Sequence, residues 1–159
     1  MKVLVTGGAG YIGSHVVKQL SEQGYGVVVY DNLSTGRRDS VLAGKFVQGD
    51  LADQDKLNAL FEVEKFQAVM HFAGSIVVPE SVEKPLEYYS NNTKNTLNLL
   101  MTCRKYKVNK FIFSSTAAVY GMLASGICLE DSPLEPMNPY GTSKWMTEMM
   151  LKDLSIAQK

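Results

Sequence analysis

The sequence predicts an α/β fold in which a doubly wound parallel sheet carries helices on both faces. Short apolar runs, including residues 3–5, 27–30 and 68–74, alternate along the chain with stretches of helical periodicity. Strands that alternate with helices are joined by right-handed crossovers, which makes the sheet parallel. The first apolar run also breaks into a glycine-rich turn before the first helix, and this arrangement predicts the strand order 3-2-1-4-5.

The glycine-rich turn contains Gly7, Gly10 and Gly13. In such a turn the first glycine permits an unusual backbone dihedral, the second lets a phosphate approach main-chain N–H groups, and the third lets the helix pack on the strand. With the positive end of the helix dipole, these N–H groups form an anion site. The alternative is a glycine-rich turn in an ordinary core, but its position between a strand and a helix favours the anion site.

An acidic residue ends the second apolar run. Asp31 lies about twenty residues beyond Gly13, where a dinucleotide-binding fold needs a carboxylate to accept hydrogen bonds from the adenosine ribose. The turn and this acid together predict a Rossmann-type domain. Residues 32–38 form a polar loop that we place under the adenosine. Arg37 and Arg38 could pair with the 2′-phosphate of NADP, but Asp31 would repel that phosphate, so NAD is the expected cofactor.

Composition and charge exclude several classes of function. The chain has 159 residues, enough for one domain that buries about 70% of the surface exposed when unfolded. Its formal net charge is zero, so neither nucleic acid nor an anionic membrane is an expected partner. A strand begins by residue 3 and no apolar run could span a bilayer, so we expect no signal peptide and a cytoplasmic protein. Cys103 and Cys128 are expected to be reduced structural thiols, and no metal site is expected.

The next segments continue the alternation of strand and helix. Residues 45–51 predict a third strand that ends in an acid, Asp50. On its own, Asp50 is also open to interpretation as a simple turn residue. Asp53 is expected to cap a helix whose apolar face, which includes Leu57 and Phe61, covers the sheet.

Residues 68–74 predict a fourth buried strand. Its end, at Phe72, Ala73 and Gly74, is small and flexible where the chain must pass close to a bound pyrophosphate and nicotinamide ribose. His71 lies inside this apolar run. We interpret it as a hydrogen-bonded core residue and not as a catalytic one.

A long helical pattern runs from Leu86 to Tyr106. Near its start it carries Asn91, Asn92 and Asn95, which are unusual in a helix because asparagine side chains compete with helical hydrogen bonding. This cluster implies a polar task for the beginning of the helix.

The last predicted strand and helix contain the catalytic candidates. Residues 110–116 predict the fifth strand, which ends in three hydroxyl-bearing residues, the last being Thr116. This strand would form an edge of the sheet, and an apolar edge invites aggregation. A loop over residues 121–139 follows, and Tyr140 then opens the last helix directly after Pro139.

Tyr140 and Lys144 lie one helical turn apart, so their side chains leave the same face. A tyrosine hydroxyl, with a pKa near 10, is a poor base at neutral pH. Lowering that pKa by about three units requires roughly 4 kcal/mol, which one cation at about 4 Å supplies in an effective dielectric near 20. A lysine ammonium or an oxidised nicotinamide is such a cation. A hydroxyl from Thr116 completes the set by binding a substrate oxygen and exchanging its proton with Tyr140.

The spacing of a tyrosine and a lysine is weak information by itself. Tyr106 and Lys110 have the same spacing, but they straddle a helix end and a strand start, so we expect no shared face. If the sequence had no Tyr140, the hydroxyls of Ser114, Ser115 and Thr116 would be interpreted as ordinary polar residues at the end of a strand.

A set of motifs occurs in the order and at the spacing of a known family, at residues 6–13, 31–36, 50–51, 71–74, 91–92, 114–121 and 138–144. On these motifs the chain resembles the UDP-glucose 4-epimerase family, in the nucleotide-sugar branch of the extended short-chain dehydrogenase superfamily. The resemblance covers essentially the whole chain, but only the N-terminal half of the family.

The resemblance implies a bound NAD and a set of site residues. The implied cofactor-binding residues are Gly7, Gly10, Tyr11, Ile12, Gly13, Asp31, Asn32, Leu33, Ser34, Thr35, Gly36, Asp50, Leu51, Phe72, Ala73, Gly74, Asn91, Tyr140 and Lys144. Tyr140 would be the base, Lys144 would hold the nicotinamide ribose, and Thr116 would bind the sugar hydroxyl. In the implied reaction Tyr140 takes the proton of the 4-hydroxyl while hydride passes from C4 to NAD. The 4-keto sugar then turns over and the hydride returns to its other face.

Two departures from the family matter. Ile76 stands where some members carry a lysine that contacts the cofactor, so it is assigned no charged contact. The family's second half, which supplies most of the uridine nucleotide pocket and discriminates between hexoses, is absent from this chain. We therefore expect a fragment without turnover of its own. By resemblance, a homodimer would form through helices near residues 90–106 and 140–155.

Two other functions stay open. Nucleotide-sugar 4,6-dehydratases share the turn and the tyrosine-lysine pair, but place an Asp-Glu pair just after the hydroxyl-bearing strand, where this chain has Ala117 and Ala118. A catalytically silent NAD-sensing module would keep the nucleotide half and lose the substrate half. Retention of Tyr140, Lys144 and Thr116 argues against the sensor, because cofactor binding alone needs no phenolic base.

Overall fold

The computed structural model describes residues 1–123 and 126–157. The chain divides into two compact units. We call the first the sheet unit, which comprises Met1–Gly74 and Asn98–Ser114, and the second the helical unit, which comprises Ser75–Leu97 and Ser115–Lys159. Part of the predicted loop, residues 124–125, and the last two positions of the chain lie outside the described residues.

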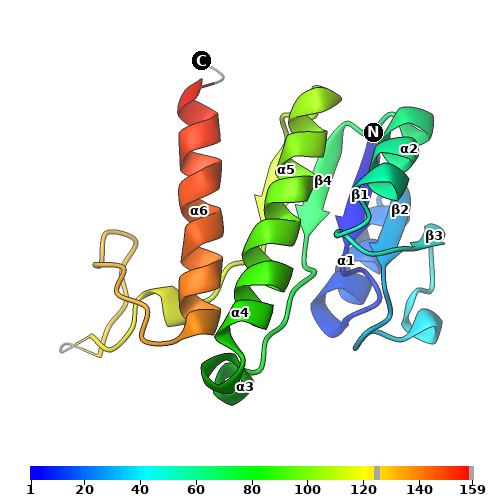
Figure 1. The fold of residues 1–159 in the computed structure, drawn as a ribbon. Helices are drawn as coiled ribbons and strands as arrows, with labels where there is room; N and C mark the ends of the chain where they lie inside the picture. Colours follow the sequence, from blue (N-terminus) through cyan, green and yellow to red (C-terminus); the bar gives the residue numbers. More distant parts are fainter. Residues whose placement is uncertain (124–125, 158–159) are drawn as a thin grey trace. The chain divides into compact units, whose positions relative to one another are not determined.

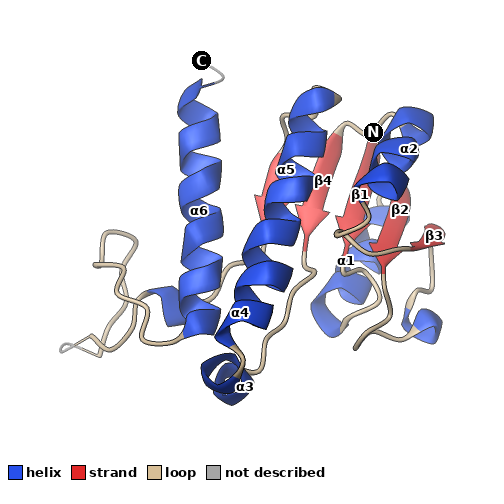
Figure 2. Ribbon diagram, viewed as in Figure 1, coloured by secondary structure: helices blue, strands red, loops and turns tan. Residues whose placement is uncertain are grey.

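The sheet unit holds a five-stranded sheet in the order β3-β2-β1-β4-β5 (Figures 1 and 2). The strands are β1 (Lys2–Thr6), β2 (Gly26–Asp31), β3 (Lys45–Gln48), β4 (Ala68–His71) and β5 (Phe111–Phe113). All neighbours pair in parallel, and Val5 of β1 lies in register with Val29 of β2 and Met70 of β4. The predicted Rossmann-type α/β fold and its strand order are confirmed.

Helices cover both faces of this sheet (Figure 1). They are α1 (Tyr11–Glu22), α2 (Gln54–Glu64) and α5 (Asn95–Lys105), with a short 3₁₀ helix, η1 (Arg38–Ser40), in the loop after β2. Successive side chains of β1 point to opposite faces. Val5 packs in one core cluster with Val17 of α1, whereas Leu4 packs in another with Leu57 of α2 and Leu99 of α5. Burial on both faces explains why the central strands are continuous apolar runs.

The last three strands are shorter than the sequence predicts, and β4 ends at His71 before the predicted residues 72–74. The first two strands, β1 and β2, are each one residue longer at both ends than predicted. β3 stops at Gln48, and Asp50 Oδ1 then accepts the Ala52 N–H at 2.8 Å, which turns the chain. β5 stops at Phe113. The predicted three hydroxyls therefore follow the strand, and the last of them, Thr116, starts the 3₁₀ helix η3 (Ala117–Val119).

Two structural roles predicted for single residues are confirmed. Asp53 caps α2, because its Oδ1 accepts the Lys56 N–H at 3.0 Å. His71 is 1% exposed, and its Nδ1 lies 2.6 Å from Thr6 Oγ1, as expected of a hydrogen-bonded core residue. β5 also forms the predicted edge of the sheet.

The helical unit contains α3 (Val78–Glu83), α4 (Pro85–Tyr88), the π-helical segment η2 (Tyr89–Lys94), the first turn of α5, η3, and α6 (Pro139–Ala157). Helix α6 contacts α3, α4, η2 and η3.

The long helix predicted from residue 86 is continuous along the chain, because α4, η2 and α5 follow one another without a gap, but it contains a π-helical turn. Pro139 starts α6, and Asn138 caps it by accepting the Gly141 N–H at 2.9 Å.

Glu64, at the C-terminal end of α2, joins this helix to the first residues of two strands. Its carboxylate accepts hydrogen bonds from Lys45 Nζ at 2.6 Å and from Lys2 Nζ at 2.9 Å. The hydrogen bond from Lys45, and then the one from Lys2, hold the pKa of Glu64 below its ordinary value of 4.5. The negative charge of Glu64 therefore stabilises the sheet unit.

Glu64→Gln is expected to lower the free energy of unfolding by about 1 kcal/mol at neutral pH, because both lysines are partly exposed and solvent screens the pairs. Since the folded pKa is depressed, this stabilisation is present above pH 4.5 and is lost as the pH falls below it. Urea unfolding of both proteins at about pH 7 and about pH 3 measures the effect. A difference of equal size at the two pH values would contradict the role assigned to the charge.

Candidate functional site

The glycine turn joins β1 to α1 within the sheet unit. Gly7 has a φ of +72°, and its N–H donates to the Tyr30 carbonyl oxygen at 3.0 Å. A side chain at Gly7 would overlap the backbone of Phe72 and Ala73, and one at Gly13 would overlap the Gly7 carbonyl oxygen. The steric roles predicted for these two glycines are confirmed, because only glycine fits at either position.

Helix α1 presents its N-terminus beside this turn. Gly10 is the N-cap residue, and in the described part of the chain no side chain caps this helix. Tyr11 and Ile12 in the first turn are 83% and 56% exposed. The first N–H groups of a helix lack intrahelical acceptors. This end of α1 therefore offers main-chain donors and a positive dipole to an anion, as a phosphate-binding turn requires.

Asp31 ends β2 and is 8% exposed. Its Oδ2 accepts the Ala9 N–H at 2.9 Å, and its Oδ1 accepts the Leu33 N–H at 2.8 Å. The carboxylate thus ties the glycine turn to the loop after β2, a structural role that the sequence pattern does not indicate. Each carboxylate oxygen keeps a second lone pair. The predicted hydrogen bonds from a ribose are compatible with this geometry and stay a prediction.

Asp50 lies in a small polar network with the residue that follows Asp31. Asn32 Nδ2 donates to Asp50 Oδ2 at 2.7 Å, and the Tyr30 hydroxyl donates to the Asp50 carbonyl oxygen at 2.9 Å. Burial, followed by the charges of Asp53 and Asp50, raises the pKa of Tyr30 to about 12, so its hydroxyl stays a donor. The interpretation of Asp50 as a turn residue is confirmed, and its contact with a cofactor stays a prediction.

A hollow of about 460 Å³ lies beside the glycine turn. It is lined by Ala9, Gly10, Tyr11, Ser14, His15, Thr35, Arg37, Asp39, Ser40 and Leu42. Three of these, Gly10, Tyr11 and Thr35, are predicted cofactor residues. The others come from the start of α1 and from the loop after β2, and nothing in their spacing distinguishes them in the sequence.

The two arginines of this loop have different surroundings. Arg37 lines the hollow, and its N–H donates to the Ala9 carbonyl oxygen at 3.0 Å. The guanidinium of Arg38 lies over the Phe46 ring, 4.6 Å from its centroid, and donates to the Val41 carbonyl oxygen at 3.4 Å. Arg38 is therefore held on the protein surface, which agrees with the expected preference for NAD over NADP.

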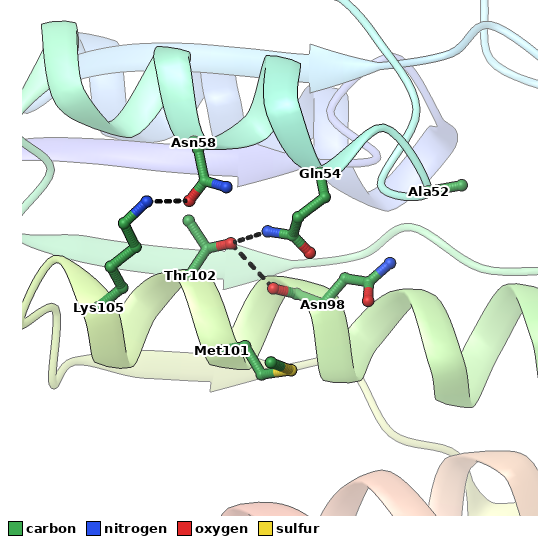
Figure 3. A pocket seen from close by; sticks show the side chains of 7 residues that line it. All are labelled: Ala52, Gln54, Asn58, Asn98, Met101, Thr102 and Lys105. Atoms are coloured by element: carbon green, nitrogen blue, oxygen red, sulfur yellow. Dashed lines mark hydrogen bonds between the residues drawn. The ribbon is translucent and has the colours of Figure 1, made fainter.

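A second cavity, of about 570 Å³, lies between α2 and α5 (Figure 3). Its lining is Ala52, Gln54, Asn58, Asn98, Met101, Thr102 and Lys105. Gln54 Nε2 donates to Thr102 Oγ1 at 2.6 Å, and Lys105 Nζ donates to Asn58 Oδ1 at 3.2 Å. It contains none of the predicted site residues. The nearby Leu51, a predicted cofactor residue, buries its side chain in the core.

In the helical unit, the asparagine cluster organises the segment after Gly74. Asn92 is 3% exposed; its Oδ1 accepts the Ser75 N–H at 2.7 Å, and its Nδ2 donates to the Ser75 carbonyl and to Ser143 Oγ, both at 3.0 Å. Asn91 Nδ2 donates to Ser75 Oγ at 2.9 Å. The polar task predicted for this cluster is thus structural, since it joins Ser75 and α6 to the π-helical segment. The cofactor contact of Asn91 stays a prediction.

The three predicted catalytic residues all belong to the helical unit. Thr116 Oγ1 accepts the Ala118 N–H at 3.1 Å and keeps its own proton to donate. Tyr140 and Lys144 lie four residues apart at the start of α6, so their side chains share a face. Lys144 is 4% exposed, and burial lowers its pKa from 10.5 to about 8. The ammonium form therefore still predominates at pH 7.

The predicted site residues are divided between the two units. Residues 7–74 of the set belong to the sheet unit, where the turn, Asp31 and the loop after it lie in contact. Asn91, Thr116, Tyr140 and Lys144 belong to the helical unit. Among residues 1–123 and 126–157, no three His, Cys, Asp or Glu side chains gather as metal ligands. No helix within these ranges is long and apolar enough to cross a membrane.

The fold and the glycine turn are those of Rossmann-type dinucleotide-binding domains. Comparison with protein families makes this specific: residues 3–158 match the NAD dependent epimerase/dehydratase family, and the chain belongs to it.

Individual proteins of this family are similar to the chain over nearly its whole length. UDP-glucose 4-epimerase of Azospirillum brasilense is 54% identical over 157 residues, which are 98% of this chain and 45% of that protein. The solved UDP-Glc/GlcNAc 4-epimerase of Campylobacter jejuni has a TM-score of 0.95 at 51% identity, over 98% of this chain and 49% of that one. UDP-glucose 4-epimerase of Brucella ovis, solved in complex with NAD, has a TM-score of 0.95 at 48% identity. The match covers 98% of this chain and 48% of that one. The chain spans about half the length of the relatives it matches.

The free energy of unfolding of the wild type is expected to rise by about 1–3 kcal/mol between pH 8 and pH 10.5, because the folded state loses a proton at Lys144 that the unfolded state keeps. Lys144→Met removes this group, so its stability should lack that rise. Urea unfolding of both proteins at pH 7 and at about pH 10 measures the difference. Lys152→Met, at an exposed position of the same helix, should keep the rise and is the control. An equal pH dependence in the wild type and in Lys144→Met would contradict the lowered pKa of Lys144.

Proposed function

We propose that the chain is the NAD-binding half of a UDP-glucose 4-epimerase, and that the whole protein inverts C4 of a UDP-hexose. The family membership of residues 3–158, together with Thr116, Tyr140 and Lys144 in one structural unit, carries this proposal. Residues 1–159 would form one NAD-binding domain, and a second half like that of the relatives would supply the uridine nucleotide pocket.

The residues of the sheet unit fit the cofactor. A Cβ at Gly10 would meet the Gly7 carbonyl oxygen at 3.3 Å, and no other atom of the described residues, outside its own helix and chain neighbours, lies within 4 Å of it, so this side of the turn is otherwise open. The pyrophosphate would lie there, against the N–H groups of the turn. Asp31 would accept hydrogen bonds from the adenosine ribose through its remaining lone pairs, since its carboxylate is already oriented by two backbone donors.

The residues of the helical unit supply proton transfer and orientation. NAD, when bound, supplies the redox chemistry, accepting hydride from C4 of the sugar and returning it to the other face. Tyr140 removes the proton of the 4-hydroxyl and gives it back after the sugar has turned over. Thr116 donates a hydrogen bond from its hydroxyl to the same sugar oxygen, without transferring the proton. Lys144, protonated below pH 8, holds the nicotinamide ribose and stabilises the phenolate form of Tyr140.

The proposal extends to the oligomeric state, the small-molecule partner and the cellular compartment of the whole protein. Helix α5 exposes Leu97 and Met101, at 43% and 60%, and α6 exposes Met149 and Ile156, at 39% and 59%, so each offers apolar contacts for a homodimer. A UDP-sugar would be the small-molecule partner, as the names of the relatives suggest. Cys103 and Cys128 are both free thiols, as in a reducing compartment such as the cytoplasm.

The purified chain is expected to bind NAD, and saturating NAD should raise its melting temperature by about 5 °C or more at a hundredfold excess over Kd. Gly10→Val should lose this shift, because the new side chain fills the space for the pyrophosphate. Lys18→Val, an exposed change on the same helix, should keep it. Thermal unfolding with and without NAD, and mass analysis of dinucleotide released on denaturation, measure the binding. No release and no shift for the wild type would refute a working cofactor site.

Catalysis is tested in a completed protein, defined here as this chain extended by the second half that its relatives carry. Tyr140→Phe is expected to lower the rate of UDP-galactose conversion by at least about 100-fold, because the base is removed, while NAD affinity changes little. Tyr106→Phe is the matched control, because Tyr106 and Lys110 have the same spacing as Tyr140 and Lys144 but lie in no common helix. Tyr106 follows the end of α5, and Lys110 precedes β5. Unchanged conversion by Tyr140→Phe would favour another base, and loss of activity in Tyr106→Phe would contradict the assignment.

A further inference from the structure

Glu148 lies on α6 one turn beyond Lys144, and it joins two segments of the helical unit. Ser115 Oγ donates a hydrogen bond to Glu148 Oε1. Ser115 directly precedes Thr116, whose hydroxyl the proposed function assigns to the substrate. This contact therefore ties the backbone next to Thr116 to the helix that carries Tyr140.

The position of Glu148 on α6 matches such a role. Tyr140, Lys144 and Glu148 follow one another at intervals of four residues, so their side chains share one face of the helix. Gly141 provides a second close contact, because a Cβ there would lie 2.7 Å from the Ala118 carbonyl oxygen. Two contacts, about 10 Å apart along the helix, thus hold the segment around η3 against α6.

Neighbouring hydroxyls in this segment have different tasks. The Ser115 proton is committed to Glu148, whereas Thr116 Oγ1 accepts the Ala118 N–H at 3.1 Å and keeps its proton to donate. The hydrogen bond from Ser115 to Glu148 therefore fixes the backbone next to Thr116, and the Thr116 hydroxyl remains available to a ligand. Without the carboxylate, the segment would lose the hydrogen bond of Ser115, whereas the close contact at Ala118 and the cap of η3 would stay.

We propose that Glu148 is a positioning residue, which sets the Thr116 hydroxyl relative to the Tyr140 phenol by holding Ser115. This inference rests on the proposed function, because it assigns the aligned groups to catalysis. Proton transfer is sensitive to such alignment, and a displacement of about 1 Å can cost roughly 100-fold in rate.

The structural part is tested in the 159-residue chain by NMR. The ¹³C resonances of the Thr116 methyl group and the Tyr140 ring are compared in the wild type and in variants. Glu148→Ala should shift the Thr116 methyl, and Ser115→Ala should reproduce that shift from the other side of the contact. Glu148→Gln should preserve the wild-type position, because its amide oxygen still accepts the Ser115 hydroxyl. Asp153→Ala, an exposed carboxylate on the same helix, is the control and should change neither resonance.

An unmoved Thr116 methyl in both Glu148→Ala and Ser115→Ala would overturn the proposal. So would a Glu148→Gln spectrum as disturbed as that of Glu148→Ala, since rescue by the amide distinguishes the hydrogen bond from charge. Ser115→Ala removes a single hydroxyl, so the comparison survives if Glu148→Ala fails to fold.

The catalytic part is tested in the completed protein. Glu148→Ala should lower kcat about 10- to 100-fold with little change in KM for the UDP-sugar or in NAD affinity, and Glu148→Gln should restore kcat to near the wild-type value. An unchanged kcat in Glu148→Ala would overturn the catalytic part. If the unsubstituted completed protein has no epimerase activity, the proposed function fails, and the NMR comparison then decides whether Glu148 positions Thr116.

Discussion

In the sheet unit, the glycine turn and the loop after β2 depend on one carboxylate at the end of β2. Asp31 accepts main-chain N–H groups from Ala9 in the glycine turn and from Leu33 in its own loop, so both of its oxygens are oriented before any ligand arrives. Hydrogen bonds to a charged acceptor contribute about 1.5–3 kcal/mol each. Because Leu33 has a φ of +61°, these bonds also hold a backbone conformation that is uncommon for a leucine. The same residue therefore builds the turn and, in the proposed function, would accept hydrogen bonds from a ribose.

The helical unit follows a similar plan, with buried polar groups that hold the backbone near the catalytic candidates. Asn92 satisfies its amide on Ser75 and Ser143, and the π-helical turn puts it among these partners. Ser143 precedes Lys144, and burial lowers the pKa of Lys144 to about 8. The proposed function gives this buried ammonium a task, because it would hold the nicotinamide ribose beside Tyr140.

The sequence was sufficient to predict the features that follow from periodicity and local chemistry. The parallel order, the Asp53 cap, the core role of His71 and the steric demands at Gly7 and Gly13 are all local or periodic in origin. Contacts between distant segments were not predictable. The hydrogen bonds from Ala9 to Asp31 and from Ser115 to Glu148 join positions far apart in the chain, and no spacing rule marks them. The π-helical turn was signalled only by its asparagines, because their competition with helical bonding does not specify which geometry results.

Amide hydrogen exchange of the ligand-free chain, measured by NMR, tests most directly whether Asp31 organises the nucleotide site in advance. The account predicts slow exchange at the Ala9 and Leu33 N–H groups, which donate to the carboxylate, and fast exchange at Tyr11 and Ile12 in the uncapped first turn of α1. Exchange at Ala9 and Leu33 as fast as at Tyr11 would show that the turn is not fixed by Asp31, and would contradict a preformed site.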